Sequence, residues 1–282
     1  MEKLSLLLFS NSEFLILLCF TFVILGIGYF LYRLEYFKID KHRSILSLVL
    51  MMIIYAIISF WKLGSNRFPT TTWQPTAEKQ QITFDFGNSE KFDAIYTIYG
   101  EGDTNSNPSA YQIGTNQIQI YASNNLQDWT HIASLKQGNI YTYAIEQGNW
   151  QYRYIKLINI NNNSSLTEIG FRNEDHTGFL PISILRDKQK DGPYPGSLLI
   201  DEQDKLVISP TYYDQAYFDE IYHVRNAWEI ANGQYMYASV HPLLGTNIIA
   251  LSIHLFGMNP LAWRLPGAIA GVLMLPVLYG IL

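Results

Sequence analysis

Apolar residues gather toward the two ends of the chain, on either side of a long mixed region. Residues 14–63 and 235–282 are predominantly apolar, whereas residues 64–234 mix apolar and polar positions as a globular domain does. Residues 14–32 and 44–61 contain no charge and run for 19 and 18 residues. A helix rises about 1.5 Å per residue and a bilayer core is roughly 30 Å thick, so each run predicts a membrane-spanning helix.

A short connector at residues 33–43 joins these two runs and carries four Lys or Arg residues. Basic connectors are retained in the cytoplasm. Residues 1–63 are therefore predicted to form two spans, with the N-terminus and residues from about 64 to 240 outside. A cleaved signal peptide is the alternative for the first run, but the apolar part of a signal peptide is usually about 7–15 residues long. We expect a retained span.

The C-terminal apolar region predicts two further helices. No Asp, Glu, Lys or Arg occurs from residue 235 to 263. A third span is expected at about residues 243–256, a turn at 257–260, and a fourth apolar run at 265–282. Because the sequence ends inside that run, we expect the 282 residues to be part of a longer polytopic protein or a truncated reading frame.

The central region alternates apolar and polar residues in short runs separated by turn residues. This pattern over residues 68–175 predicts a β-sandwich outside the membrane. The strands are expected at residues 82–87, 92–99, 118–122 and 152–157, the first of them ending at Gly87. Residues 176–216 are rich in proline, glycine and charge, which predicts a linker to the membrane-associated region 217–282.

Residues 218–231 have apolar positions at three- and four-residue spacing, which predicts an amphipathic helix lying at the membrane surface. Arg225 and Glu229 are expected to pair on its polar side. Asp219 and Glu220 fall in its first turn, where the helix dipole favours negative charge. Two acids that merely cap an interfacial helix are therefore one interpretation of this segment.

The charge balance excludes one class of partner. The whole chain has a net charge of −5, and residues 64–235 hold 12 Lys or Arg against 20 Asp or Glu. Nucleic acid is not expected as a partner, because phosphate backbones are bound by basic surfaces. The chain has a single cysteine, so no disulfide can form within it.

The order of short motifs in the β region is similar to that of the discoidin, or coagulation factor 5/8 type C, family of galactose-binding-like domains. The matching segments are residues 83–87, 120–129, 153–157 and 166–171. The resemblance implies a jelly roll whose end loops bind glycans or lipid headgroups. The sequence thus predicts a mixed fold, a polytopic α-helical membrane protein with an extracytoplasmic β-sandwich.

A second resemblance covers about 80 residues at the C-terminal end. Its segments are residues 199–203, residues 217–223, the motif His241-Pro242-x-x-Gly245 and residues 255–265. Their order resembles bacterial members of the protein O-mannosyltransferase family, which are polytopic enzymes. These enzymes move a sugar, usually mannose, from a polyprenyl-phosphate carrier to a Ser or Thr hydroxyl.

The resemblance implies a role for four residues. Asp219 is expected to be the general base that deprotonates the acceptor hydroxyl, with inversion at the anomeric carbon. Glu220, His241 and Arg264 are expected to bind substrate, with Glu220 shaping the acceptor site and His241 reaching the phosphate or orienting its loop. No metal and no cofactor are implied. The expected partners are the lipid-linked sugar, a protein or cell-surface glycan acceptor, and the lipids of a bacterial plasma membrane.

Two departures from the family pattern keep two alternatives open. The family has a lysine where this chain has Thr246, and a proline where it has Leu243. A lysine at 246 would offset phosphate charge, so its absence bears on donor binding. The alternatives are a membrane-tethered glycan-binding protein without catalysis and an inactive, truncated homologue.

Overall fold

The computed structural model describes residues 11–33, 41–100, 112–113, 118–135, 138–160, 165–175, 177–236 and 241–281. The chain divides into two compact units. The helical unit comprises Met1–Asn66 and Leu251–Leu282, and the β unit comprises Arg67–Ala250. The boundary falls inside helix α5 (Leu243–Phe256), which contributes residues to both units.

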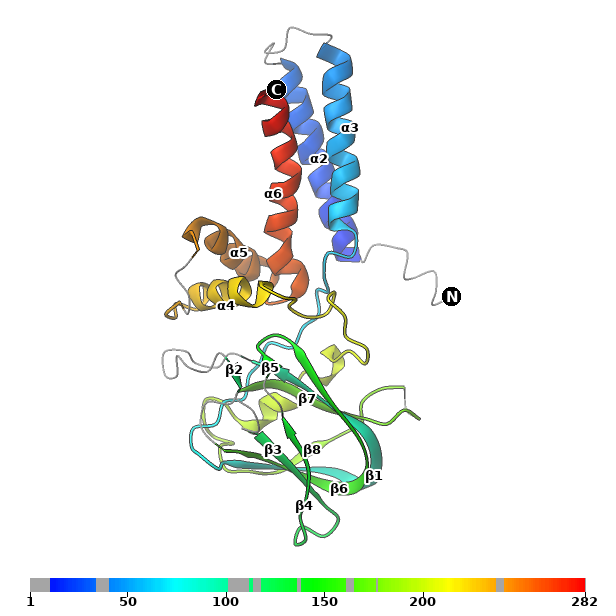
Figure 1. Cartoon of the computed structure of the whole chain (residues 1–282), viewed down its shortest axis with the longest axis vertical. Coiled ribbons are helices and arrows are strands. Elements are labelled where there is room, and N and C mark those ends of the chain that lie inside the picture. Colours follow the sequence, from blue (N-terminus) through cyan, green and yellow to red (C-terminus); the bar gives the residue numbers. More distant parts are fainter. Residues whose placement is uncertain are drawn as a thin grey trace. The chain divides into compact units, whose positions relative to one another are not determined.

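Three long apolar helices form the helical unit. They are α2 (Asn11–Arg33), α3 (Lys41–Phe60) and α6 (Pro260–Ile281), and they lie side by side (Figure 1). Their shared core consists of Ile24, Leu48, Met52, Ala56, Phe60, Leu265 and Val272. Within the described residues, the uncharged runs predicted at 14–32, 44–61, 243–256 and 265–282 are helical, except that Trp61 follows the last residue of α3.

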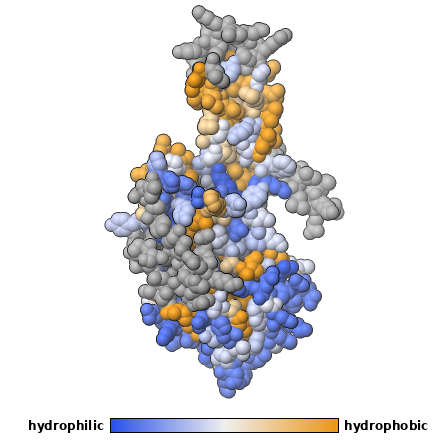
Figure 2. Space-filling model, viewed as in Figure 1, coloured by the Kyte–Doolittle hydropathy of each residue, from blue (hydrophilic) through white to orange (hydrophobic). Residues whose placement is uncertain are grey.

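The outer surface of these helices is also apolar. Phe22, Ile58 and Val277 are each more than 60% exposed. Figure 2 shows hydrophobic residues over these helices, whereas the surface of the β unit is mainly hydrophilic. Such a surface is unfavourable in water and marks contact with lipid or protein. Within the described residues, Pro260–Ile281 is the one helix long and apolar enough to span a membrane; shorter apolar helices occupy Leu15–Tyr29, Ile45–Phe60 and Leu243–Phe256. The multi-pass arrangement stays a prediction.

The turn predicted at residues 257–260 is confirmed. Gly257 ends α5 with φ +85°, a left-handed conformation that glycine adopts without steric cost. The Asn259 side chain then caps α6, because its Oδ1 accepts a hydrogen bond from the Ala262 amide at 2.9 Å. Helix α6 therefore begins at Pro260, five residues before the predicted fourth run, at a position that tolerates proline.

Over the residues that the structure describes, the β unit is built on one antiparallel sheet of six strands and a separate two-stranded sheet. The six strands are β1 (Gln81–Tyr99), β3 (Ile118–Ser123), β4 (Thr130–Leu135), β6 (Tyr143–Asn159), β7 (Leu166–Arg172) and β8 (Ser183–Asp187). Their order is β4-β3-β6-β1-β7, with β8 also paired to β1. The small sheet joins β2 (Gln112–Ile113) to β5 (Gly138–Asn139). The coarse prediction of an antiparallel β domain is confirmed.

Strand β1 is the central element of the large sheet. It pairs with β6 along its length, with β8 near its start and with β7 near its end. Gly87, which was predicted to end a strand, instead lies inside β1 with φ +86°. It sits where the register with β6 shifts between Asp85 and Glu90, and glycine at such a bulge lets the strand bend and continue. Apolar residues of both halves of β1, with those of β3, β6 and β7, share one core cluster.

Residues 177–216, within the segment predicted to be a linker, belong to the β unit. This segment contains β8 and two 3-10 helices, η1 (Gly196–Leu199) and η2 (Gln203–Lys205). Leu199 is fully buried in the core cluster. The many prolines, glycines and charges of this segment predicted a linker, although a few of its apolar residues pack on the sheet.

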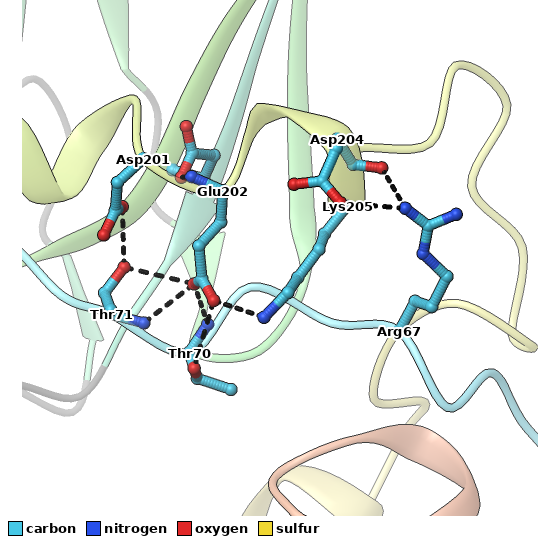
Figure 3. Close-up of polar contacts among 8 residues, drawn as sticks. Arg67, Thr70, Thr71, Asp201, Glu202, Asp204 and Lys205 are labelled. Atoms are coloured by element: carbon cyan, nitrogen blue, oxygen red, sulfur yellow. Dashed lines mark hydrogen bonds and ion pairs between the residues drawn. The ribbon is translucent and has the colours of Figure 1, made fainter.

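Glu202 ties this segment to the chain that precedes β1. Its carboxylate accepts hydrogen bonds from the backbone amides of Thr70 and Thr71, the latter at 2.9 Å, and pairs with Lys205 (Figure 3). The Asp201 carboxylate accepts a hydrogen bond from the Thr71 hydroxyl at 2.8 Å. Hydrogen bonds to an ionised carboxylate are stronger than those between neutral groups. The hydrogen bonds of Glu202 are therefore the main polar contact between the two segments.

We predict that Glu202→Gln destabilises the chain by about 2–3 kcal/mol, because charge-assisted bonds are lost and the new amide nitrogen faces donors. Denaturant unfolding of the full chain in mild detergent at pH 7 measures this loss. The matched control is Glu174→Gln, an exposed position, where the change is expected to stay within about 0.5 kcal/mol. Equal stability of the two variants would contradict the role given to Glu202.

Candidate functional site

The predicted acidic pair lies at the start of helix α4 (Glu220–Ala231). Asp219 occupies the N-cap position, and Phe218 before it has φ +49°. A left-handed conformation costs roughly 1–2 kcal/mol in a residue other than glycine. The chain therefore enters α4 through a sharp, strained turn, and this turn leaves Tyr217 and Phe218 largely exposed.

The two carboxylates of the pair have different surroundings. Glu220 turns back and accepts a hydrogen bond from the Tyr217 amide at 3.0 Å, which closes the turn. Asp219 is exposed and its side chain makes no capping hydrogen bond, although an N-cap aspartate usually bonds to an amide of the first turn. The Asp219 carboxylate is thereby left able to accept a proton from another molecule.

The segment that leads into α4 is fastened to the β unit. The Tyr143 amide donates to the Gln215 side chain at 2.8 Å, and the Ala216 amide donates to the Tyr141 carbonyl at 3.0 Å. The Tyr143 hydroxyl accepts a hydrogen bond from the Val207 amide at 3.1 Å. Burial raises the pKa of Tyr143, so this hydroxyl stays neutral. These bonds fix where α4 begins relative to the sheet.

Helix α4 buries an ion pair that was predicted to face solvent. The Arg225 Nε atom lies 2.9 Å from the Glu229 Oε1 atom, and both side chains are 0% exposed. The prediction of an i, i+4 pair is confirmed, but its placement on the polar side of the helix is wrong. Periodicity cannot separate an exposed pair from a buried one, because opposite charges that satisfy each other can enter a protein interior together.

His223 and His241 are in ring contact. Their ring centroids lie 4.9 Å apart with the planes at 41°. His223 is half-buried on α4, and His241 is exposed just before α5. The sequence predicted His241 as a substrate-binding residue and His223 as a structural one. Its position four residues after Asp219, on the same face of a helix, is the signal that could have identified it.

The first turn of α5 follows His241 directly. Leu243 and Leu244 are 52% and 73% exposed, whereas Thr246 is buried. A Cβ atom added at Gly245 would meet nothing within 4 Å, so this side of the turn is open. The position at which the family pattern has lysine therefore faces inward, and the open side is formed by His241, the leucines and Gly245.

Arg264 lies on α6 in the helical unit. Its Nη1 atom donates a hydrogen bond to the Leu63 carbonyl at 3.0 Å, which ties α6 to the chain just after α3. A Cβ atom added to Gly64 would lie only 2.6 Å from the Pro260 backbone, so the chain after α3 and the start of α6 are in close contact there. The predicted role of Arg264 in substrate binding stays a prediction.

Three carboxylates of the β unit lie close enough together to hold a metal ion. Oxygens of Glu168, Asp201 and Glu202 are within 4.8 Å of one another. Glu168 is fully buried and accepts hydrogen bonds from the Glu202 amide at 3.1 Å and from Gln203 Nε2 at 2.8 Å. Burial raises the pKa of Glu168 to about 8 in spite of these bonds. All three carboxylates take part in internal hydrogen bonds, so we assign the cluster a structural role.

Comparison with known proteins finds relatives for part of the chain. No protein-family model matches it. A polyprenol-phosphate-mannose–protein mannosyltransferase of Mycolicibacterium smegmatis is 35% identical over 72 residues, and strain MKD8 of that organism has a relative with the same values. The match covers 23% of this chain and 14% of the relative. The chain therefore spans about one-seventh of the length of the curated relatives it matches.

Several solved carbohydrate-related structures are partly similar to the chain. CpGH89CBM32-6 from Clostridium perfringens has a TM-score of 0.30 and 17% identity, covering 40% of this chain and 82% of that one. The C-terminal domain of a Bacteroides fragilis chitobiase has a TM-score of 0.27 and 18% identity, covering 38% and 64%. A chitosan-binding module from Paenibacillus sp. IK-5 has a TM-score of 0.27 and 17% identity, covering 42% and 84%.

Stability is expected to fall as the pH rises from 5 to 8, because folded Glu168 keeps a proton that the unfolded chain releases near pH 4.5. The folded chain binds more protons than the unfolded chain between the unfolded pKa and the folded pKa of about 8. The nearby charges of Asp201 and Glu202 act in the same direction as burial. Thermal unfolding of the full chain in detergent measures the difference in stability between Glu168→Gln and the unchanged chain. This difference should shift in favour of Glu168→Gln between pH 5 and pH 8. An equal difference at both pH values would contradict the protonated state.

Glu229→Gln is predicted to destabilise the chain by about 3–5 kcal/mol, because it leaves the Arg225 charge buried without its carboxylate. The double variant Arg225→Met, Glu229→Met removes both charges and should recover most of the loss. Denaturant unfolding in detergent compares the two variants. A single variant as stable as the unchanged chain would show that the pair is solvated.

Proposed function

We propose that this protein is a membrane glycosyltransferase that moves a sugar, a mannose residue by analogy with its relatives, from a polyprenyl-phosphate carrier to a hydroxyl acceptor. The observation that carries the proposal is the exposed Asp219 carboxylate, left without a capping bond at the start of α4. The partial identity with a polyprenol-phosphate-mannose–protein mannosyltransferase supports it. Protein Ser or Thr hydroxyls are the proposed acceptors.

The proposed reaction is a single displacement. A hydroxyl becomes a strong nucleophile when a positioned base takes its proton in the transition state. Asp219 takes that proton, the acceptor oxygen bonds to the anomeric carbon, and the bond from this carbon to the phosphate oxygen breaks. The lipid phosphate leaves with the electron pair as a stable anion and needs no general acid. The product sugar has the inverted anomeric configuration.

The other predicted site residues take supporting roles. Glu220 already shapes the turn that presents Asp219, and we assign it to the acceptor side. His241, on the open side of the first α5 turn, is assigned to the donor phosphate. Arg264 is assigned to substrate binding through its resemblance to the family arginine. No metal or cofactor has a part in these steps.

We also propose a multi-pass arrangement in a bacterial plasma membrane. The connector at residues 33–43 lies in the cytoplasm, and the β unit, a discoidin-type jelly roll, lies outside. The apolar surface of α2, α3 and α6 supports contact with lipid. The exposed aromatic rings of Tyr217 and Phe218 support a place for the start of α4 at the membrane–water interface.

Asp219→Asn is predicted to reduce transfer at least 100-fold, because positioned general bases contribute typically 10²–10⁴-fold. Its stability should be unchanged, since Asp219 makes no capping bond. The assay follows mannose from polyprenyl-phosphate mannose to a Ser/Thr peptide in membranes that contain the full chain. Asp175→Asn, an exposed position, is the control. Transfer by Asp219→Asn at the control rate would place the base elsewhere.

A further inference from the structure

The contact between His223 and His241 joins two elements that the sequence separates. His223 belongs to α4, and His241 precedes α5 by two positions. Their rings approach to 4.9 Å between centroids and are tilted by 41°. Histidine is the side chain whose charge changes between about pH 5 and 8. Two imidazoles at this distance repel each other when both are protonated, unless an anion neutralises them.

The surroundings of the pair also favour an anion. Helix α5 begins at Leu243, and the backbone N–H groups of a first helical turn lack partners within the helix. The helix dipole adds positive potential at the same end. The open side at Gly245 gives a ligand access to this turn.

The first turn of α5 also exposes apolar side chains next to the histidine pair. Leu243 and Leu244 are 52% and 73% exposed next to His241. A ligand with an anionic head and an apolar chain would contact the imidazoles with one part and the leucines with the other. Inorganic phosphate would satisfy the imidazoles and leave the leucines uncovered.

Asp219 lies one helical turn before His223 on α4. Four residues correspond to about 6 Å along a helix axis. In a displacement at an anomeric carbon, the base acts on one side of that carbon and the phosphate leaves on the other. This spacing allows the sugar to lie between the carboxylate and the imidazoles, so that Asp219 does not compete for the same positive charge.

We propose that His223 and His241 together bind the phosphate of a polyprenyl-phosphate lipid. The pair supplies the positive charge that the family lysine would provide at position 246, where this chain has a buried threonine. His223 is thereby a donor-binding residue that the sequence pattern did not mark. The inference rests on the proposed transfer function for its choice of lipid.

The test compares binding of a polyprenyl phosphate with binding of the polyprenol of the same length. Full chain in nanodiscs is titrated with each lipid at pH 6.5, and the ratio of the two affinities isolates the phosphate contribution. We expect a ratio of at least 10 for the unchanged chain. His223→Gln and His241→Gln should each lower the ratio at least fivefold while polyprenol binding stays unchanged. His241→Lys should retain the ratio, and the control His254→Gln, an exposed position in α5, should match the unchanged chain.

Two outcomes would overturn the inference. The first is an unchanged ratio in both glutamine variants. The second is an equal loss of affinity for phosphate and alcohol, which would indicate a groove for the lipid tail only. Failure of the proposed function is visible separately, because Asp219→Asn is expected to keep the affinity ratio and lose transfer. Transfer retained by Asp219→Asn would contradict the base, whereas the ratio alone decides the phosphate site.

Discussion

The hydrogen bond from the Tyr217 amide to Glu220 determines what the acidic pair can do. An aspartate at an N-cap position normally bonds to an amide of the first helical turn, which would occupy one of its oxygens. In this chain Glu220 closes the turn at 3.0 Å, and the Asp219 side chain is left without a capping bond. The pair thus combines a structural carboxylate with a chemically available one, and the proposed transfer depends on that division.

A base is useful only where its position is held, because misplacement by about 1 Å can cost 100-fold in rate. The bonds of Tyr143 to residues 207 and 215 fix the chain that enters α4. Glu202 fastens the preceding segment to the chain before β1. The β unit therefore supports the start of α4 directly.

Apolar patterns predicted the helices well, because an uncharged run of 18 or 19 residues has few alternatives to a helix. The turn at Gly257 and the acidic start of α4 also followed from local residue chemistry. Strand limits were less predictable. Gly87 signals a break in the sequence, but in the sheet it bends β1 at a bulge and the strand continues.

The remaining differences come from contacts between distant residues. Residues 183–187 join the sheet because β1 offers them an edge, which composition does not reveal. The burial of Arg225 and Glu229 depends on what packs over α4, and the ring contact of His223 depends on where α5 begins. Sequence spacing located Asp219 and His241 as separate candidates, and the fold added His223 to them.

The anomeric configuration of the transferred sugar tests the central claim most directly. Nuclear magnetic resonance of the glycosylated peptide, formed by the full chain from a polyprenyl-phosphate sugar of known configuration, reports it. Direct attack by a hydroxyl that Asp219 deprotonates predicts complete inversion. A product that retains the donor configuration would require a covalent sugar intermediate and would contradict the role of Asp219 as the base.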